Sequence, residues 1–379
     1  MFFDKKNNTI KKKVLICSNY AWTIYNFRKP LIDDLIKNNY DVELLSQFDG
    51  YQDKINSQIS GIYHLSISLK GVNIFKDFYT FIHIFKKLIT IKPDFILLFT
   101  IKPVIYGSMA AKILNIPSIP MITGLGTSFI SKNWITTIVK KLYKVALKNQ
   151  KIVFFQNNDD KNLFLKENLI QEEQAKLIPG SGIDTKKFKY KKMFAKEEIT
   201  FLLIARMIKD KGVMEYIEAA SLTKKSNSNV KFKILGPLGV QNRTAISEKI
   251  IYSWHKKKTI QYLGETDNVI EEISKADCIV LPSYREGTSR VLLEAASTGR
   301  PIIATNVPGC KEVVENEING FLCEVKNSYD LFRKIQKIIT LTHEERVKMG
   351  LMGRTKIINE FDSKIVNNIY LKTLKNISK

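Results

Sequence analysis

Short runs of apolar, β-branched residues alternate with longer helical patterns along almost the whole chain. The runs are apolar throughout rather than at every second residue, which predicts strands buried on both faces. The predicted strands are Val14–Cys17, Val42–Leu45, Phe95–Phe99, Ser118–Ile122, Ile152–Phe155, Ile199–Ile204, Val230–Leu235, Thr259–Leu263, Asp277–Leu281 and Pro301–Ala304. Strands of this kind form parallel sheets with helices on both sides. The alternation therefore predicts an α/β fold.

The alternation of strand and helix patterns is interrupted once, over the lysine-rich segment Ser181–Glu198. A chain of 379 residues is also too long for a single core. We predict two doubly wound, Rossmann-like α/β domains over residues 1–190 and 191–360, followed by a C-terminal helix (361–379) that packs back toward the first domain. Ligands of such sheets bind beyond the carboxyl ends of the strands, so the two domains would face each other across a cleft.

The net charge of +23 leaves nucleic acid, an anionic membrane and phosphate-bearing substrates open as partners. No nucleic-acid-binding motif is present, which argues against the first. The chain begins with charges where a signal peptide would be apolar, and no run reaches the ~18 apolar residues of a spanning helix. We expect a cytoplasmic protein. Its cysteines lack metal-type spacing and are expected to be reduced and partly buried: Cys17, Cys278, Cys310 and Cys323.

The sharpest local feature is the segment LPSYREGTSRVLLE, residues 281–294. A buried strand ends at Leu281 and a helix opens near Thr288, with Thr288 or Ser289 as its cap. Backbone amides around Gly287–Ser289 would then point out of a helix N-terminus, which favours an anion. The alternative is an ordinary capped surface helix.

Two carboxylates, Glu286 and Glu294, frame this predicted anion site. A carboxylate repels phosphate but accepts hydrogen bonds from hydroxyl groups. A sugar nucleotide carries both kinds of group, because its ribose and hexose hydroxyls flank a diphosphate. The combination therefore indicates a sugar nucleotide.

A basic loop, ARMIKDKG, follows the first strand of the second domain and precedes a predicted helix, Gly212–Thr223. Arg206 can contact two phosphate oxygens at once, and Lys211 adds a compact charge. Basic residues in loops are usually just solvated, so only the position of this loop gives it weight.

With these motifs the second half resembles the GT4 family of retaining, GT-B-fold glycosyltransferases. EGTSRVLLE matches the E-x7-E motif of the family, and TGRPIIATNVPGCKEVVENEINGFL has the family's pattern. The first-half segments FTIKPVIYGSMAAKILNIPSIPMITGLGTSF, FFQNNDDKNLF and LIPGSGIDTKKF resemble a bacterial subgroup. That subgroup acts on polyprenyl-diphosphate-linked sugars in capsule, O-antigen or glycoprotein glycan assembly. The resemblance spans roughly residues 12–375.

The resemblance implies that Arg206 and Lys211 hold the donor diphosphate and stabilise its developing charge. Glu286 would contact the transferred sugar and Glu294 the ribose. The backbone of further residues would complete the donor site: Gly287, Thr288 and Ser289 at the phosphates, and Gly236 and Gly264 beside the base. The donor would be a UDP-linked N-acetylhexosamine and the transfer retaining, by attack on the face from which the phosphate leaves. The chain has no D-x-D motif, so no metal and no cofactor are expected.

Two positions depart from the family's pattern. Asn19 lies in a turn where many relatives have glycines, and Lys102 lies in a loop where many have a histidine. On the acceptor side we also assign Thr123, Gly124 and Gly126, which either line the pocket or only form a strand-to-loop turn. Arg290 either contacts phosphate or pairs with Glu294 one turn on.

Two helical patterns, Trp134–Lys148 and Ile74–Leu88, combine apolar and basic residues as membrane-surface helices do. Packing on the sheet would explain their apolar residues as well. We expect the enzyme to bind an anionic membrane on its cytoplasmic face, where a lipid-linked acceptor would be held. Competing hypotheses are a nucleotide-sugar epimerase of similar fold and a basic nucleic-acid-binding protein.

Overall fold

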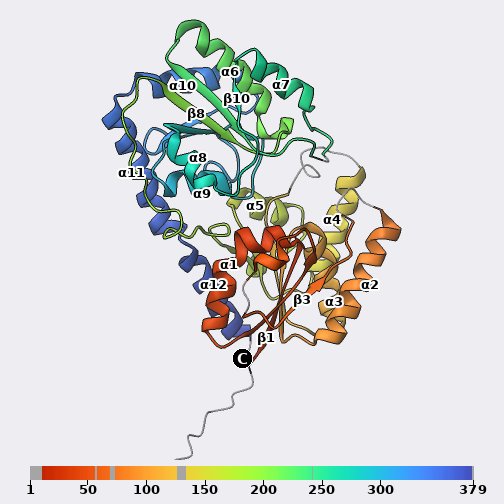
Figure 1. The fold of residues 1–379 in the computed structure, drawn as a ribbon. Coiled ribbons are helices and arrows are strands. Elements are labelled where there is room, and N and C mark those ends of the chain that lie inside the picture. Colours follow the sequence, from red (N-terminus) through yellow and green to blue (C-terminus); the bar gives the residue numbers. More distant parts are fainter. Residues whose placement is uncertain (1–10, 56–57, 69–72, 126–133, 241, 378–379) are drawn as a thin grey trace, which may run out of the picture. The chain divides into compact units, whose positions relative to one another are not determined.

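The computed structural model describes residues 11–55, 58–68, 73–125, 134–240 and 242–377 (Figure 1). The chain folds as two units that interleave in sequence. Unit 1 holds the chain up to Phe155, Asp160–Ile178 and the chain from Val366 onward. Unit 2 holds Gln156–Asp159 and Pro179–Ile365.

The sheet of unit 1 is parallel throughout and has the strand order β3-β2-β1-β4-β5-β6-β7. Its strands are β1 Lys13–Tyr20, β2 Asp41–Gln47, β3 Gly61–His64, β4 Phe95–Phe99, β5 Ser118–Ile122, β6 Val153–Phe155 and β7 Ala175–Leu177. The order turns back on either side of β1 and β4, as in a doubly wound sheet.

Side chains that alternate along the unit 1 strands enter two separate cores. Val14 and Ile16 pack with helices α1 (Ala21–Lys37) and α12 (Ser363–Ile377). Leu15 and Cys17 pack on the other face, with helices α2 Ile74–Ile91, α3 Ser108–Ile113, α4 Trp134–Leu147 and α5 Asn158–Lys166. Because both faces are covered, the strands are apolar at successive positions.

Unit 2 repeats this plan with a parallel sheet of order β10-β9-β8-β11-β12-β13. Its strands are β8 Ile199–Ile204, β9 Val230–Leu235, β10 Gln261–Tyr262, β11 Cys278–Leu281, β12 Ile302–Thr305 and β13 Gly320–Cys323. Its helices are α6 Val213–Ser226, α7 Glu248–Lys256, α8 Val269–Lys275, α9 Arg290–Ser297, α10 Ser328–Thr340 and α11 His343–Glu360. Helices α6, α7 and α10 cover one face and α8 and α9 the other, with α11 contributing to both cores. The predicted pair of doubly wound α/β units is confirmed.

Every strand that the apolar runs predict is present, but three further strands were not predicted. These are β3, β7 and β13. Each is only three or four residues long and lies at an edge of its sheet. Short edge strands pair on one side only and need little apolar sequence.

The helix pattern around Trp134–Lys148 forms α4, whose apolar side mostly packs inside unit 1: Val139, Tyr143 and Leu147 are buried. The four cysteines are free and fully buried. No described helix combines the length and the apolar character that crossing a membrane requires.

A buried arginine holds together the segments around α9 in unit 2. The guanidinium of Arg300 is fully buried and donates to the carbonyl oxygens of Lys191 and Ser274, both at 2.7 Å. Burial lowers the pKa of Arg300, and the carbonyl contacts offset part of the cost of burying this charge.

We predict that Arg300→Met lowers the free energy of unfolding by about 2–4 kcal/mol, because two buried carbonyl groups lose their donor. Urea unfolding measures the change. Arg333, an exposed arginine on α10, provides the control, since Arg333→Met removes no buried contact. Equal stability of the two variants would contradict the role of Arg300.

Candidate donor-sugar site

Two loops of unit 2 meet where β8 and β11 end. The backbone of Gly212 lies so close to Pro282 that a Cβ atom there would be 2.0 Å from the Pro282 carbonyl oxygen. Gly212 also has a φ of +71°, so glycine is required on both grounds. The amide of Tyr284 donates to Asp210 O at 2.9 Å, and its hydroxyl donates to Glu215 Oε1 at 2.6 Å. Burial, together with the Glu215 carboxylate, raises the pKa of Tyr284, so this hydroxyl keeps its proton.

This junction brings two of the residues predicted to be catalytic into contact. Lys211 Nζ lies 2.5 Å from Glu286 Oε1, and both side chains are largely shielded from solvent. Arg206 follows β8 in the same loop; it is exposed, and its guanidinium has no partner among the described residues. A paired cation and a free one thus lie at one edge of the sheet.

The loop that carries Gly287, Thr288 and Ser289 rests on two segments for which the sequence alone predicts no contact with it. The buried side chain of Asn157 donates to Gly287 O at 2.7 Å, and Thr288 Oγ1 donates to Gln156 O at 3.2 Å. On the other side, Ser289 N donates to Gly309 O at 2.9 Å. Both segments stand out in the sequence, as FFQNN and as the Pro-Gly pair before Cys310. Neither pattern, however, predicts which loop the segment contacts.

The predicted cap of this helix is confirmed in its position, but the side-chain hydrogen bond of a cap is missing. Ser289 is the N-cap residue of α9, yet its side chain makes no capping hydrogen bond. The Thr288 hydroxyl binds Gln156 O instead, and the Ser289 amide is already bonded. An anion at this helix start would therefore meet fewer free amides than the sequence suggested.

Of the two expectations for Arg290, the pairing with Glu294 is present. Arg290 Nε lies 3.0 Å from Glu294 Oε1, and Nη1 donates to Gly182 O at 2.7 Å. Glu294 is buried, and burial raises its pKa while Arg290 acts in the opposite direction. The carboxylate is thus buried with Arg290 as its paired counter-charge, and the charge of Lys187 acts in the same direction.

The two glycines assigned to the base lie together at the ends of β9 and β10. Gly236 N donates to Gly264 O at 2.8 Å, and Tyr262 Oη donates to Gly236 O at 3.0 Å. A Cβ atom on Gly236 would be 2.0 Å from Ala205 O, directly before Arg206. The base-side glycines therefore border the loop of Arg206.

The predicted acceptor-side residues belong to unit 1. The backbone N–H of Asn19 donates to Thr100 Oγ1 at 3.2 Å. The buried side-chain Oδ1 of Asn19 has no partner among the described residues. Thr100 itself has a φ of +71°, a strained conformation for a β-branched residue. Lys102 Nζ lies 2.5 Å from the buried Asp77, so its charge is neutralised.

The remaining acceptor-side residues follow β5. Thr123 and Gly124 are half-buried there, and Gly124 has a φ of +108°. Gly126 lies outside the described residues. A turn accounts for the positive φ of Gly124, and the assignments of Thr123 and Gly124 to the acceptor pocket stay predictions.

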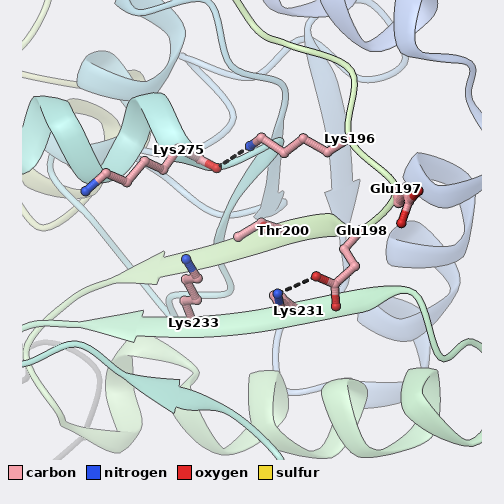
Figure 2. A pocket seen from close by; sticks show the side chains of 7 residues that line it. All are labelled: Lys196, Glu197, Glu198, Thr200, Lys231, Lys233 and Lys275. Carbon is pink, nitrogen blue, oxygen red and sulfur yellow. Dashed lines mark hydrogen bonds and ion pairs between the residues drawn. The ribbon is translucent and has the colours of Figure 1, made fainter.

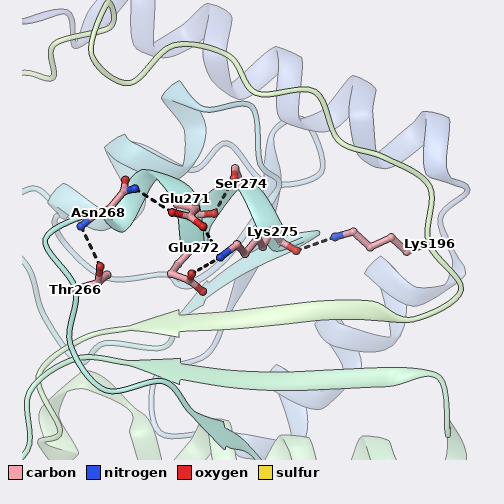
Figure 3. Close-up of polar contacts among 7 residues, drawn as sticks. All are labelled: Lys196, Thr266, Asn268, Glu271, Glu272, Ser274 and Lys275. Carbon is pink, nitrogen blue, oxygen red and sulfur yellow. Dashed lines mark hydrogen bonds and ion pairs between the residues drawn. The ribbon is translucent and has the colours of Figure 1, made fainter.

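A hollow of about 490 Å³ lies at the opposite, amino-terminal edge of the unit 2 sheet (Figure 2). It is lined by Lys196, Glu197, Glu198, Thr200, Lys231, Lys233 and Lys275. Lys231 pairs with Glu198, and Lys275 lies 2.7 Å from both Glu271 and Glu272 (Figure 3). Acidic partners thus compensate the charges of Lys231 and Lys275. The hollow also lies at the amino-terminal ends of the strands, whereas ligands of such sheets bind beyond the carboxyl ends.

Two family models match the chain. The model of the family described as glycosyl transferases group 1 matches residues 184–356, and that described as glycosyl transferase 4-like matches residues 13–157. The chain belongs to the GT4 glycosyltransferases. The two models together cover the sheet of unit 2 and every strand of unit 1 except β7 of this glycosyltransferase, including the loops of Arg206, Lys211, Glu286 and Glu294.

Several named enzymes are similar to this glycosyltransferase in sequence. N,N'-diacetylbacillosaminyl-diphospho-undecaprenol alpha-1,3-N-acetylgalactosaminyltransferase of Campylobacter jejuni is 28% identical over 96% of this chain and 98% of its own. UDP-Gal:alpha-D-GlcNAc-diphosphoundecaprenol alpha-1,3-galactosyltransferase of Escherichia coli is 28% identical over 68% of this chain and 69% of its own.

Among solved structures, a sucrose-phosphate synthase from Thermosynechococcus elongatus aligns with a TM-score of 0.81 at 17% identity, over 97% of this chain and 99% of that one. HepE of Anabaena in complex with UDP-glucose aligns with a TM-score of 0.77 at 16% identity, over 96% of this chain and 99% of that one. At such identities these structures establish the GT-B fold alone.

The raised pKa of Glu294 leads to a prediction about pH. The folded state holds the Glu294 proton above the ordinary pKa of 4.5, where the unfolded chain has lost it. Between these two pKa values the folded state binds more protons, so this group makes stability fall as pH rises.

We therefore expect the wild type to lose stability relative to Glu294→Gln as pH rises above 4.5, by at most about 1.4 kcal/mol per pH unit. Urea unfolding of both proteins across this range measures the difference. A difference that stays constant with pH, or that changes in the opposite direction, would contradict the raised pKa.

Proposed function

We propose that this glycosyltransferase moves a sugar, with retention, from a UDP-linked N-acetylhexosamine donor to a polyprenyl-diphosphate-linked glycan. The observation that carries the proposal is the contact of Lys211 with Glu286 beside Arg206, at the ends of β8 and β11. Two cations suit a diphosphate, and a carboxylate between them and the helix suits a sugar hydroxyl. The names of the related enzymes support a diphosphate-lipid acceptor.

In the proposed reaction the bond between the anomeric carbon and the phosphate oxygen breaks, and a bond from that carbon to the acceptor hydroxyl oxygen forms on the same face. The acceptor proton passes to the departing phosphate oxygen. Arg206 and Lys211 stabilise the charge that develops on the diphosphate. Glu286 orients the sugar, and Glu294 accepts hydrogen bonds from the ribose hydroxyls.

Transfer is preferred to epimerisation because the related enzymes named above are transferases. The acceptor-side assignments of Asn19, Thr123, Gly124 and Gly126 remain part of the proposal. Lys102 does not offer a free charge to a ligand, since its side chain is paired with that of Asp77. Its proposed role on the acceptor side is to hold this pair. The anionic inner face of the cell membrane is the proposed site of action.

The first test is ligand stabilisation without metal. UDP is expected to raise the melting temperature in EDTA, because Arg206 and Lys211 supply the counter-charge to the diphosphate. At a concentration 100 times the Kd the stabilisation is about 2.7 kcal/mol. Stabilisation that disappears in EDTA and returns with magnesium or manganese would refute the metal-free donor site.

The second test separates the two carboxylates. Glu294→Gln is expected to weaken UDP binding itself. Glu286→Gln should leave UDP binding nearly unchanged and raise the barrier to transfer by roughly 2–3 kcal/mol, the value of a lost charge-assisted hydrogen bond. Thermal shift and initial rates measure the two effects.

The matched control is Glu173→Gln, which changes an exposed glutamate of unit 1 and should alter neither quantity. If both site variants lost UDP affinity equally, the division of roles between Glu286 and Glu294 would be wrong.

A further inference from the structure

Helix α2 carries two apolar stripes, and the core of unit 1 uses only one of them. Thr80, Ile84, Leu88 and Ile91 are buried against the sheet. On the outward side the exposed fractions are 78% for Ile74, 86% for Phe75, 63% for Phe78 and 60% for Tyr79. These four residues lie in the first two turns and form what we call the outer α2 stripe.

The start of α2 is firmly held, so this exposure is not the result of a frayed end. The Asn73 side chain accepts from Lys76 N at 3.0 Å and caps the helix. Asp77 is buried in the first turn, where it accepts from Asn73 N at 3.0 Å and lies 2.5 Å from Lys102 Nζ. The outer stripe is therefore a preformed surface.

The charges around the stripe are of one sign. Exposed Lys76 and Lys86 flank it on α2, and the single acidic residue of this helix, Asp77, is buried and paired. Helix α4, which packs with α2 on the π-helical turn Pro103–Gly107, has no acidic residue. Helix α4 exposes further apolar residues, Trp134 and Val145, and further lysines, Lys141 and Lys144.

Exposed aromatic residues beside lysines that have no acidic partner in the described part of the chain fit the interface of an anionic bilayer. There, rings enter the boundary between headgroups and acyl chains while ammonium groups meet lipid phosphates.

We propose that the outer α2 stripe inserts into an anionic lipid surface and is the main membrane contact of the protein. This rests on the proposed function, in which the acceptor is lipid-linked. The Lys102–Asp77 pair joins the stripe to the chain directly after β4, at the carboxyl edge where ligands of such sheets bind. Inserting α2 would therefore hold the bilayer close to the acceptor-side residues of unit 1, and α4 would contribute mainly charge.

The experiment uses flotation of the full chain with vesicles of phosphatidylglycerol and phosphatidylcholine, at low and at high salt. Phe75→Ser combined with Phe78→Ser is expected to reduce vesicle binding at least tenfold at both salt concentrations, because apolar insertion is not screened. Reversing Lys141, Lys144 and Lys148 to Glu should reduce binding mainly at low salt.

The matched control is Tyr252→Ser combined with Tyr329→Ser, which removes two similarly exposed aromatic residues from α7 and α10 and should bind as the wild type does. Vesicle binding by the Phe75 and Phe78 variant equal to that of the control would overturn the proposal. So would a change in its oligomeric state with unchanged vesicle binding, because a second copy of the chain would then be the occupant.

UDP stabilisation, measured on the same proteins, reports the donor site separately. If UDP stabilises every variant while the Phe75 and Phe78 variant alone loses vesicle binding, both proposals are supported. If UDP fails to stabilise any of them, the proposed function fails independently of the membrane contact.

Discussion

The approach of Gly212 to the carbonyl oxygen of Pro282 is the contact on which the candidate donor site depends. It brings the turn after β8 against the turn after β11, and no side chain larger than hydrogen fits between them. The hydrogen bonds from Tyr284 to Asp210 and Glu215 then fix the two turns side by side. Lys211 and Glu286 meet because each lies within two residues of these bonds.

This arrangement shows why the site could be anticipated in part from sequence. Parallel strands end at one edge of a sheet, so polar residues just after successive apolar runs must lie near one another. Arg206, Lys211, Gly236, Gly264 and Glu286 could be assigned to one site on that basis. The fold followed from the same runs, whose residues are apolar on both faces. The edge strands β3, β7 and β13 could not be predicted, because a run of only three or four residues is too short to show a periodic pattern.

The side-chain pairings inside the site could not be predicted from the sequence, because partners far apart in the chain leave no local pattern. The contact of Asn157 with Gly287 spans 130 residues, and the pair of Lys102 with Asp77 removed a charge that looked available. Arg290 was different. Its spacing from Glu294 on a helix predicted a pair as one of two outcomes, yet its bond to Gly182 had no signal at all. Local spacing thus predicts contacts along one helix, while contacts between loops require coordinates.

The interleaving of the two units also matters for how such enzymes can be recombined. Gln156–Asp159 directly follows β6 of unit 1 but belongs to unit 2, and the last helix returns to unit 1 after Ile365. A chimaera joined once, near residue 179, would therefore pair the Gly287 loop of one parent with the Asn157 of another and separate α12 from its own sheet. Exchanging a donor half between relatives without loss of its support requires grafting the four-residue segment along with it and leaving the final helix behind.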